Sequence, residues 1–311
     1  MKTKVLILGG ILVDHYMLVE KFPERGQDVQ IKDSFYKVGG CAINVAKTLK
    51  NLGMDPFIVA TIGSDYRGQM ISQYLNEQGF DRRCIHTDKA RESGYSVSLV
   101  EASGERTFLT YKGCDDHFSP DMISPDLLPD IGYVYLTGYY LLEPNYHRDI
   151  LQLLARIKEL GGKILFDPGP LAAGIEHQTL LDVIQLAHVV TPNETESEKI
   201  ARIYRVEGKV SDWFLTHGVE AVVLKKGSEG VTAWTADRQL TCPPFSVKSI
   251  DTTGAGDSFA GGFIFGLINR YSLEFTLRFA SACGAISTTF LGPHGHFTLA
   301  DVNRLIDGER S

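Results

Sequence analysis

Short apolar runs alternate with amphipathic stretches along most of this chain. The apolar runs have the length of buried strands, and the stretches between them repeat apolar residues at helical spacing. We predict strands at residues 5–13, 56–62, 133–136, 163–167, 188–191 and 221–225, and helices at residues 44–52, 68–78 and 146–160 and from Asn193 onward. This alternation predicts an α/β fold in which helices cover both faces of a mostly parallel central sheet. Functional groups are then expected at the carboxyl ends of the strands.

Two regions depart from this rhythm, because their apolar residues recur with a period of two. They are residues 29–32 and the pair 95–100 and 107–111, with Ser103 and Gly104 as the turn within the pair. We predict that they form antiparallel strands outside the central sheet. The apolar outer face and free edge of such a sheet favour pairing with a second copy of the chain, so we predict a homodimer through it.

Composition narrows the classes of function. A chain of 311 residues with 43% hydrophobic residues and no Pro/Ser-rich linker fits one large domain with a small appendage. The net charge of −7 argues against nucleic acid or an anionic membrane as a partner, since both call for a basic face. No apolar run approaches the ~20 residues of a membrane helix. Five cysteines without a C-x-x-C pair fit the cytoplasm, and a small molecule is the natural substrate.

The most informative motif is residues 251–263, which read Asp-Thr-Thr-Gly-Ala-Gly-Asp-Ser-Phe-Ala-Gly-Gly-Phe. Gly254 and Gly256 can take backbone angles closed to other residues, so successive N–H groups can converge on an anion at a helix N-terminus. Asp257 then lies beside that anion, where a carboxylate is useful only if it handles a proton or a metal. An acidic helix cap after a glycine turn is the structural alternative. Two aspartates around spaced glycines favour a functional site.

This motif resembles the C-terminal signature of the ribokinase-like, or PfkB-type, carbohydrate kinases. Two more motifs match that family in its order: Val-Gly-Gly-Cys-Ala-Ile-Asn-Val-Ala at 38–46 and Asn-Glu-Thr-Glu at 193–196. The resemblance implies a single ribokinase-like kinase domain over 1–311, with strands from about 15–38 and 92–115 forming a lid over the sugar. It implies ATP-dependent phosphorylation of a primary hydroxyl of a sugar or sugar-like substrate, with Mg²⁺ as a cofactor.

The resemblance also implies roles for the residues around the glycine turn. Asp257 is the base that accepts the proton of the attacking hydroxyl, and the backbone of Gly254, Ala255 and Gly256 holds the transferring oxygens. Asp251 lies near a monovalent-cation site in the family, which implies K⁺. The alternative is that Asp251 only caps the turn.

Four residues near the N-terminus match the sugar contacts of the family. Asp14, at the end of the first predicted strand, matches an early aspartate that accepts hydrogen bonds from adjacent sugar hydroxyls. Gly39 and Gly40 let hydroxyls approach the backbone, and Asn44 offers an amide with donors and an acceptor. A tight strand-to-helix turn would explain the two glycines equally well without a ligand.

Residues in the second half of the chain match the nucleotide side. Asn193 and Glu196 have the spacing of a capping box, which needs no ligand. In the family this pair organises magnesium and phosphate through water, so the resemblance makes Glu196 a metal-side residue. Lys225, Gly227 and Gly230 match the strand and glycine turn near the nucleotide phosphates. Lys225 either reaches a phosphate or points to solvent.

Tyrosines replace the acidic sugar contact that ribokinases carry near residue 140. Tyr139 and Tyr140 would offer flat apolar faces, which favours a larger or partly apolar acceptor than ribose, such as a nucleoside, a keto-acid sugar or a hexose. Glu143 is a candidate substitute for the acidic contact. The alternative is that both tyrosines pack beneath the lid and select nothing.

Other classes of protein fit the sequence less well than a carbohydrate kinase does. A dinucleotide-dependent oxidoreductase lacks support, because no G-x-G-x-x-G follows the first strand, and no P-loop motif is present. A nucleoside kinase of the same family stays open. So does a non-catalytic sugar-sensing module, although the presence of Asp257 favours an enzyme.

His294 and His296 are more typical of loop residues than of a metal site. Cys41 either touches substrate or is merely buried.

Overall fold

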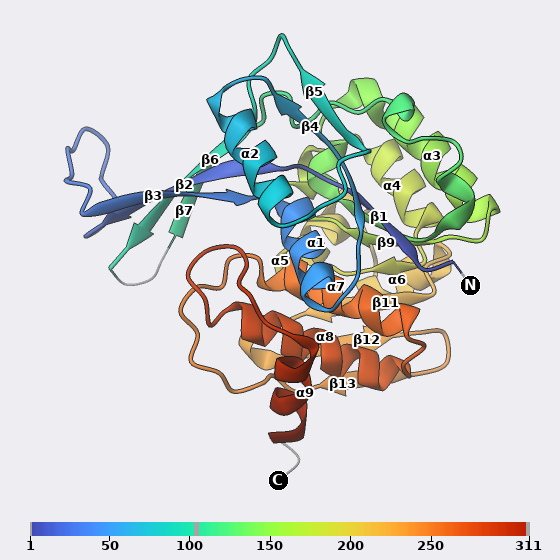
Figure 1. Ribbon diagram of the computed structural model, residues 1–311. Coiled ribbons are helices and arrows are strands. Elements are labelled where there is room, and N and C mark those ends of the chain that lie inside the picture. Colours follow the sequence, from blue (N-terminus) through green and yellow to red (C-terminus); the bar gives the residue numbers. More distant parts are fainter. Residues whose placement is uncertain (1, 103–105, 309–311) are drawn as a thin grey trace.

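The computed structural model describes residues 2–102 and 106–308. Its centre is a nine-stranded sheet in the order β13-β12-β11-β10-β9-β8-β1-β4-β5, and a separate four-stranded small sheet has the order β3-β2-β6-β7 (Figure 1). The strands of the central sheet are β1 (Lys4–Leu8), β4 (Phe57–Gly63), β5 (Ile85–Asp88), β8 (Ile131–Thr137), β9 (Lys163–Asp167), β10 (Val189–Val190), β11 (Ala221–Lys225), β12 (Val231–Trp234) and β13 (Gln239–Cys242). The strands of the small sheet are β2 (Leu12–Val19), β3 (Asp33–Gly39), β6 (Tyr95–Glu101) and β7 (Arg106–Tyr111).

Helices cover both faces of the central sheet, which confirms the predicted fold class. They are α1 (Cys41–Asn51), α2 (Tyr66–Glu77), α3 (His147–Glu159), α4 (His177–Leu186), α5 (Glu194–Ile203), α6 (Val210–Thr216), α7 (Ala255–Ile268), α8 (Leu273–Ser287) and α9 (Leu299–Gly308). The pairings from β5 across to β11 are parallel, and only those of β12 with its two neighbours are antiparallel. The sheet is therefore mostly parallel.

Two hydrophobic cores lie on opposite faces of the sheet, because successive side chains of a strand point to opposite sides. In β1, Val5 and Ile7 belong to the core beneath α1, α2, α7, α8 and α9. Leu6 and Leu8 belong to the core beneath α3, α4, α5 and α6. A strand buried on both faces reads as one continuous apolar run, as the parallel-sheet prediction requires.

The prediction of one strand over residues 5–13 was wrong. The run breaks at Gly9 and Gly10, and the chain continues as β2 in the small sheet. Gly10 has a steric reason to be glycine, since a Cβ there would collide with the Asp115 carboxylate. Asp14 consequently lies inside β2 and does not end the first strand.

The small sheet projects from one side of the central sheet, to the left in Figure 1. Its outer pairings, β2 with β3 and β6 with β7, are antiparallel as predicted. Its central pairing of β2 with β6 is parallel, which differs from the prediction. Between these two strands the chain forms β3, α1, β4, α2 and β5, and that length allows the crossover that a parallel pair needs.

Two local predictions for the small sheet need comment. Residues 29–32 form no strand, and the strand that follows begins at Asp33. The predicted turn at Ser103 and Gly104 lies outside the described residues. Among the described helices, none combines the length and the apolar character needed to cross a membrane.

Candidate active site

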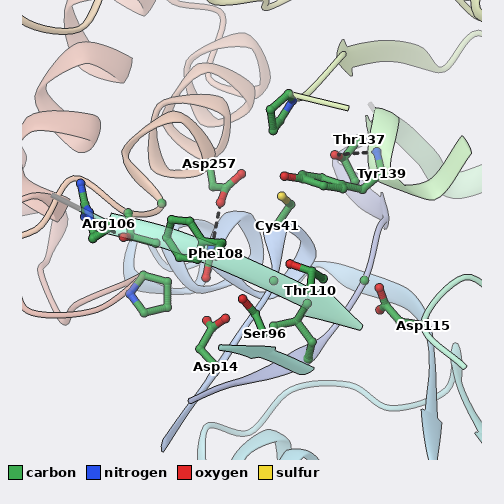
Figure 2. Close-up of a pocket in the computed structure, with 18 of the residues that line it drawn as sticks. Asp14, Cys41, Ser96, Arg106, Phe108, Thr110, Asp115, Thr137, Tyr139 and Asp257 are labelled. Atoms are coloured by element: carbon green, nitrogen blue, oxygen red, sulfur yellow. Dashed lines mark hydrogen bonds between the residues drawn. The ribbon is translucent and has the colours of Figure 1, made fainter. Parts of the chain in front are cut away.

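A cavity of about 550 Å³, the first cavity, lies between the small sheet and the carboxyl ends of central strands (Figure 2). It is lined from the small sheet by β2, β6 and β7, from the central sheet by the end of β8, and from the helices by the first turns of α1 and α7. Asp14, Asn44 and Asp257, three residues singled out in the sequence, all line it. The fold thus brings together side chains from both ends of the chain.

Asp257 lies in the first turn of α7, at the wall of the first cavity. The turn before it depends on Gly254, which has a left-handed φ of 73° and whose Cβ would collide with the Pro293 carbonyl oxygen. The Asn44 side-chain amide donates a hydrogen bond to Asp257 Oδ2 over 2.7 Å. The Ala255 N–H donates to the Thr252 carbonyl over 3.3 Å. The amides of residues 256 and 257 belong to the helix start, where no preceding helical carbonyl serves them.

Two carboxyl groups of the first cavity have strongly shifted pKa values. Burial raises the pKa of Asp257 to about 7; the Asn44 hydrogen bond opposes this shift and the Asp167 charge adds to it. Burial, and then the charge of Asp257, raises the pKa of Asp14 to about 7. A carboxyl group with a pKa near neutrality can exchange a proton at physiological pH, as a general base must.

The paired glycines at the end of β3 are required by their surroundings. A Cβ at Gly39 would collide with Asp14 Oδ2, so the missing side chain makes room for that carboxylate. Gly40 has a φ of 98° and precedes α1, and a Cβ there would meet the Gly10 carbonyl oxygen. The structure therefore contains the tight strand-to-helix turn, and it places Asp14 directly against that turn.

Asn193 and Glu196 form the predicted capping box at the start of α5. The Glu196 N–H donates to Asn193 Oδ1 over 2.8 Å, and the Asn193 N–H and side-chain amide donate to the Glu196 carboxylate over 2.9 Å each. Burial, and then the Asp167 charge, raises the pKa of Glu196. The cap is thus fully formed by protein atoms alone.

Asp167, at the carboxyl end of β9, pairs with the predicted site residue Lys225 and was missed in the sequence. Its Oδ2 accepts a hydrogen bond from Lys225 Nζ over 2.7 Å, and both side chains are largely buried. Burial disfavours the charge on Lys225, but Asp167 and Glu196 hold its pKa above the ordinary value. The Lys225 ammonium therefore does not point to solvent. It points toward the carboxylates of Asp167 and Glu196.

A second cavity of about 340 Å³ lies on the other side of the glycine turn. Lys225, Gly227 and Gly230 line it together with the backbone of Ala255 and Gly256. Its remaining wall is mainly apolar and includes Val231, Phe245, Val247, Phe259 and Ala285. Such a wall suits a flat aromatic group next to a turn that presents backbone amides.

Asp251 is engaged by an arginine of the small sheet. Its carboxylate accepts hydrogen bonds from the N–H groups of Thr253 and Gly292, over 2.9 and 2.8 Å, and it pairs with the Arg106 guanidinium. Arg106 also donates to the Thr253 hydroxyl over 2.8 Å and to the Thr252 hydroxyl. This arginine, which the sequence analysis did not consider, ties β7 to the glycine turn.

The two tyrosines after β8 have different environments. Tyr139 lines the first cavity, as Figure 2 shows. Tyr140 is fully buried and donates its hydroxyl to the His117 carbonyl over 3.2 Å, so it packs inside the protein. Glu143 accepts hydrogen bonds from Asn145 at the start of a 3₁₀ turn and does not belong to the described lining of the cavity.

The structure also places two further candidate residues, Cys41 and His294. Cys41 lines the first cavity beside Asp257 (Figure 2), and burial raises the pKa of its thiol. His294 donates to the Val38 carbonyl over 2.9 Å, and burial lowers its pKa to about 4. Within residues 2–102 and 106–308, no group of three or more His, Cys, Asp or Glu side chains is arranged to hold a metal ion.

Comparison with known proteins decides the family. Residues 2–295 match the family model described as pfkB family carbohydrate kinase. The chain belongs to this family. A ribokinase from Haemophilus influenzae is 28% identical over 297 residues, which cover 94% of each chain. A nucleoside kinase from Methanocaldococcus jannaschii is 25% identical over 273 residues, or 87% of this chain and 85% of the relative.

Solved structures show the same fold for this carbohydrate kinase. A fructokinase from Xylella fastidiosa with bound ATP superposes with a TM-score of 0.87 at 21% identity and covers 100% of both chains. The protein is an ATP-dependent carbohydrate kinase, which transfers phosphate to an alcohol group. Its relatives include sugar kinases and nucleoside kinases, so the acceptor is a sugar or a nucleoside.

Proposed function

We propose that this kinase transfers the γ-phosphoryl group of ATP to a primary hydroxyl of a sugar or sugar-like acceptor bound in the first cavity. One observation carries the proposal: the glycine turn before α7 has a cavity on each side. Asp257 lines the first cavity, whereas the backbone of Ala255 and Gly256 lines the second. An acceptor hydroxyl and a terminal phosphate can therefore meet at the helix N-terminus.

Asp257 is the base in this proposal. It accepts the proton of the acceptor hydroxyl as the oxygen attacks phosphorus and the bond to the leaving ADP oxygen breaks. Asn44 holds the carboxylate in place through its 2.7 Å hydrogen bond. The N–H groups of residues 254–256 stabilise the charge on the transferring oxygens. For this, the Ala255 N–H leaves the Thr252 carbonyl, to which it donates over 3.3 Å in this structure.

The acceptor is bound by Asp14, Gly39, Gly40 and Asn44. Asp14 is buried and lines the first cavity, so its oxygens are placed to accept hydrogen bonds from sugar hydroxyls. The small sheet acts as a lid over the acceptor. Its strands fall mainly within residues 15–38 and 92–115, and β2 begins just before residue 15. We regard residues 1–311 as one kinase domain in which this lid is an appendage.

ATP occupies the second cavity, with its phosphates toward Lys225, Gly227 and Gly230. The charge of a transferring phosphate must be neutralised, so the reaction needs Mg²⁺. Magnesium usually keeps several waters and takes few protein ligands. Asn193 and Glu196 lie beside the Asp167–Lys225 pair and would hold Mg²⁺ through water. The Glu196 and Asp167 carboxylates can accept hydrogen bonds from such waters, in addition to those that Glu196 already accepts from Asn193.

A substrate panel tests the function. ATP consumption is measured with ribose, fructose, 2-keto-3-deoxygluconate and several nucleosides. We expect ribose not to give the highest kcat/KM, because Tyr139 lines the first cavity where ribokinases carry an acidic contact. Ribose as the best acceptor would show that inference to be wrong. Acceptor binding without any ATP consumption would instead favour a sugar-sensing module, and a nucleoside as best acceptor would favour a nucleoside kinase.

Potassium activation through Asp251 is a further part of the proposal, and Arg106 sets its expected size. Because the guanidinium already neutralises Asp251, replacing K⁺ with tetramethylammonium should lower turnover only slightly in the native kinase. The loss should be larger in Arg106→Met, where a cation must supply that charge. Arg67→Met is the matched control, since Arg67 stacks on Tyr95 away from Asp251. Equal potassium dependence in all three proteins would show that Arg106 does not determine the response to K⁺.

A homodimer through the outer face of the small sheet is also proposed. Arg106, Phe108 and Thr110 of β7 line the first cavity, so Leu109 and Tyr111 point to the opposite face, where they are 60% and 49% exposed. We expect Leu109→Glu to convert a dimer to a monomer in sedimentation equilibrium. Leu171→Glu, at a comparably exposed leucine in a loop, should stay dimeric. A native protein that sediments as a monomer would contradict the proposal.

The cellular setting follows from charge and thiols. Cys41, Cys84, Cys114 and Cys283 are free thiols in the described chain. Free thiols are typical of a reducing compartment, which supports a cytoplasmic location. The net charge of −7 makes nucleic acid and anionic membranes poor partners.

A further inference from the structure

Asp115 is a buried carboxylate at the edge of the first cavity that the proposed reaction does not use. It lies on the loop after β7, is fully buried and lines the cavity. Asp14 pairs with Ser96 and Ser96 pairs with Thr110 across the sheet, and Asp115 lies on the loop beyond the end of β7. Figure 2 accordingly shows Asp115 on the side of the cavity away from Asp14.

The two oxygens of Asp115 are treated differently. Oδ2 accepts a hydrogen bond from Lys112 Nζ over 2.7 Å. Oδ1 has no hydrogen-bond partner within the described residues, although it is buried. A buried carboxylate oxygen without a donor is costly, and native proteins rarely leave one unless a ligand or water completes it.

The surroundings place this carboxylate at the wall of the cavity. Gly10 lies against the Asp115 carboxylate, and any side chain there would overlap both oxygens. Gly10 itself lines the cavity. Two other buried polar atoms of the lining, Asn44 Oδ1 and Ser96 Oγ, also lack a partner within the described residues. The unsatisfied atoms of this cavity therefore extend from the Asp14 side to Asp115.

Lys112 provides the complementary group. Burial works against its charge, but the adjacent Asp115 carboxylate raises its pKa above the ordinary value. Its ammonium lies 5.4 Å from the centre of the Tyr139 ring and lines the cavity. Since an ammonium has three donor hydrogens and one is used by Asp115, Lys112 can still donate to a ligand oxygen.

We propose that Asp115, Lys112 and Tyr139 form a subsite for the part of the acceptor that lies away from Asp14, and that this part is neutral. The Asp115–Lys112 pair binds a hydrogen-bond donor next to a hydrogen-bond acceptor, and Tyr139 offers a flat face beside them. An imide edge of a nucleobase has this pattern, and so does a pair of neighbouring hydroxyls on a hexose. A carboxylate at this position would meet Asp115, so the subsite disfavours a keto-acid sugar.

This inference rests on the proposed kinase reaction, and a substitution with a close control tests it. Asp115→Asn keeps the shape and removes the charge; Asp116→Asn is the control, because Asp116 pairs with Arg91 and does not line the cavity. We expect Asp115→Asn to raise KM for the best neutral acceptor by about tenfold or more, the cost of a hydrogen bond to a charged group. The KM of Asp115→Asn for ATP should stay near native. The melting temperature of the control, Asp116→Asn, should also stay near native.

Modified acceptors test the same subsite in the native protein. A nucleoside is compared with its N-methylated base, and a hexose with the analogue that lacks its distal hydroxyl. The analogue of whichever class is phosphorylated should lose about tenfold in kcat/KM with the native kinase and little with Asp115→Asn. A native kinase inactive with every acceptor would refute the reaction itself. Unchanged KM in Asp115→Asn, or 2-keto-3-deoxygluconate as the best acceptor, would overturn the subsite and leave the reaction standing.

Discussion

Asp257→Asn is expected to lose at least ~10²-fold in turnover while it binds ATP and acceptor with nearly native affinity. Removal of a general base usually costs 10²–10⁴-fold, and the amide keeps the size of the side chain but cannot take the proton. Steady-state kcat and calorimetric binding of each ligand separate the two effects. Turnover near the native value would rule out Asp257 as the base.

The pH dependence gives an independent check, because Asp257 must be ionised to act. With its pKa raised to about 7, kcat of the native kinase should fall as pH decreases through neutrality. The acid limb of kcat/KM belongs to Asp257 and Asp14 together, since both pKa values lie near 7. A kcat that stays constant from pH 8 to pH 5.5 would contradict a catalytic base with a pKa near 7.

The stability of Asp257→Asn should move opposite to its activity. The folded pKa of Asp257 lies above the ordinary aspartate value of 3.8, so folding favours the protonated form and the ionised carboxylate opposes folding. The stabilisation that comes from the protonated Asp257 carboxyl group is present below pH 4 and is lost as pH rises through 7. The variant has no such loss, so its melting temperature should exceed the native one by more at pH 8 than at pH 5. A variant that is inactive because it unfolds would show the reverse.

Local pattern predicted the elements of the central sheet well. The strands at 163–167 and 221–225 match β9 and β11 residue for residue. Apolar runs bounded by polar turns suffice for such strands, because both of their faces are buried. The break at Gly9 and Gly10 was missed because residues on both sides are equally apolar, and only the packing of Gly10 against Asp115 explains it.

The candidate site shows a different limit. Asp257 and Asn44 were singled out because motifs carry them, and Asp14 because its position matches an early aspartate of the family. The fold places all three in one cavity. Asp167 and Arg106 were missed because each has its partner far along the chain: Lys225 is 58 residues from Asp167, and Asp251 is 145 residues from Arg106. A lone aspartate after a strand, or a lone arginine in an exposed strand, carries no signal until the fold supplies the partner.

Asp14→Ala is expected to weaken acceptor binding by about 10²-fold and to leave ATP binding almost unchanged. In the proposed reaction the carboxylate accepts two hydroxyl hydrogen bonds, each worth about 1.5 kcal/mol or more because the acceptor is charged, and about 1.4 kcal/mol corresponds to tenfold in affinity. Asp14 lies against Gly39 in the small sheet, on the wall of the first cavity and not of the second. Its loss should therefore act on one ligand only.

A carboxylate elsewhere in the same sheet provides the control for this prediction. Asp33 begins β3, is exposed and does not line the described first cavity, so Asp33→Ala should bind acceptor and ATP as the native kinase does. Calorimetric titration of both variants with the best acceptor and with ATP makes the comparison. If Asp14→Ala weakens both ligands equally, the carboxylate holds the sheet in place and does not contact the acceptor. A selective loss of acceptor affinity, absent from Asp33→Ala, requires direct contact, because a general disturbance of the small sheet would also move Arg106 and the glycine turn that it holds through Thr253.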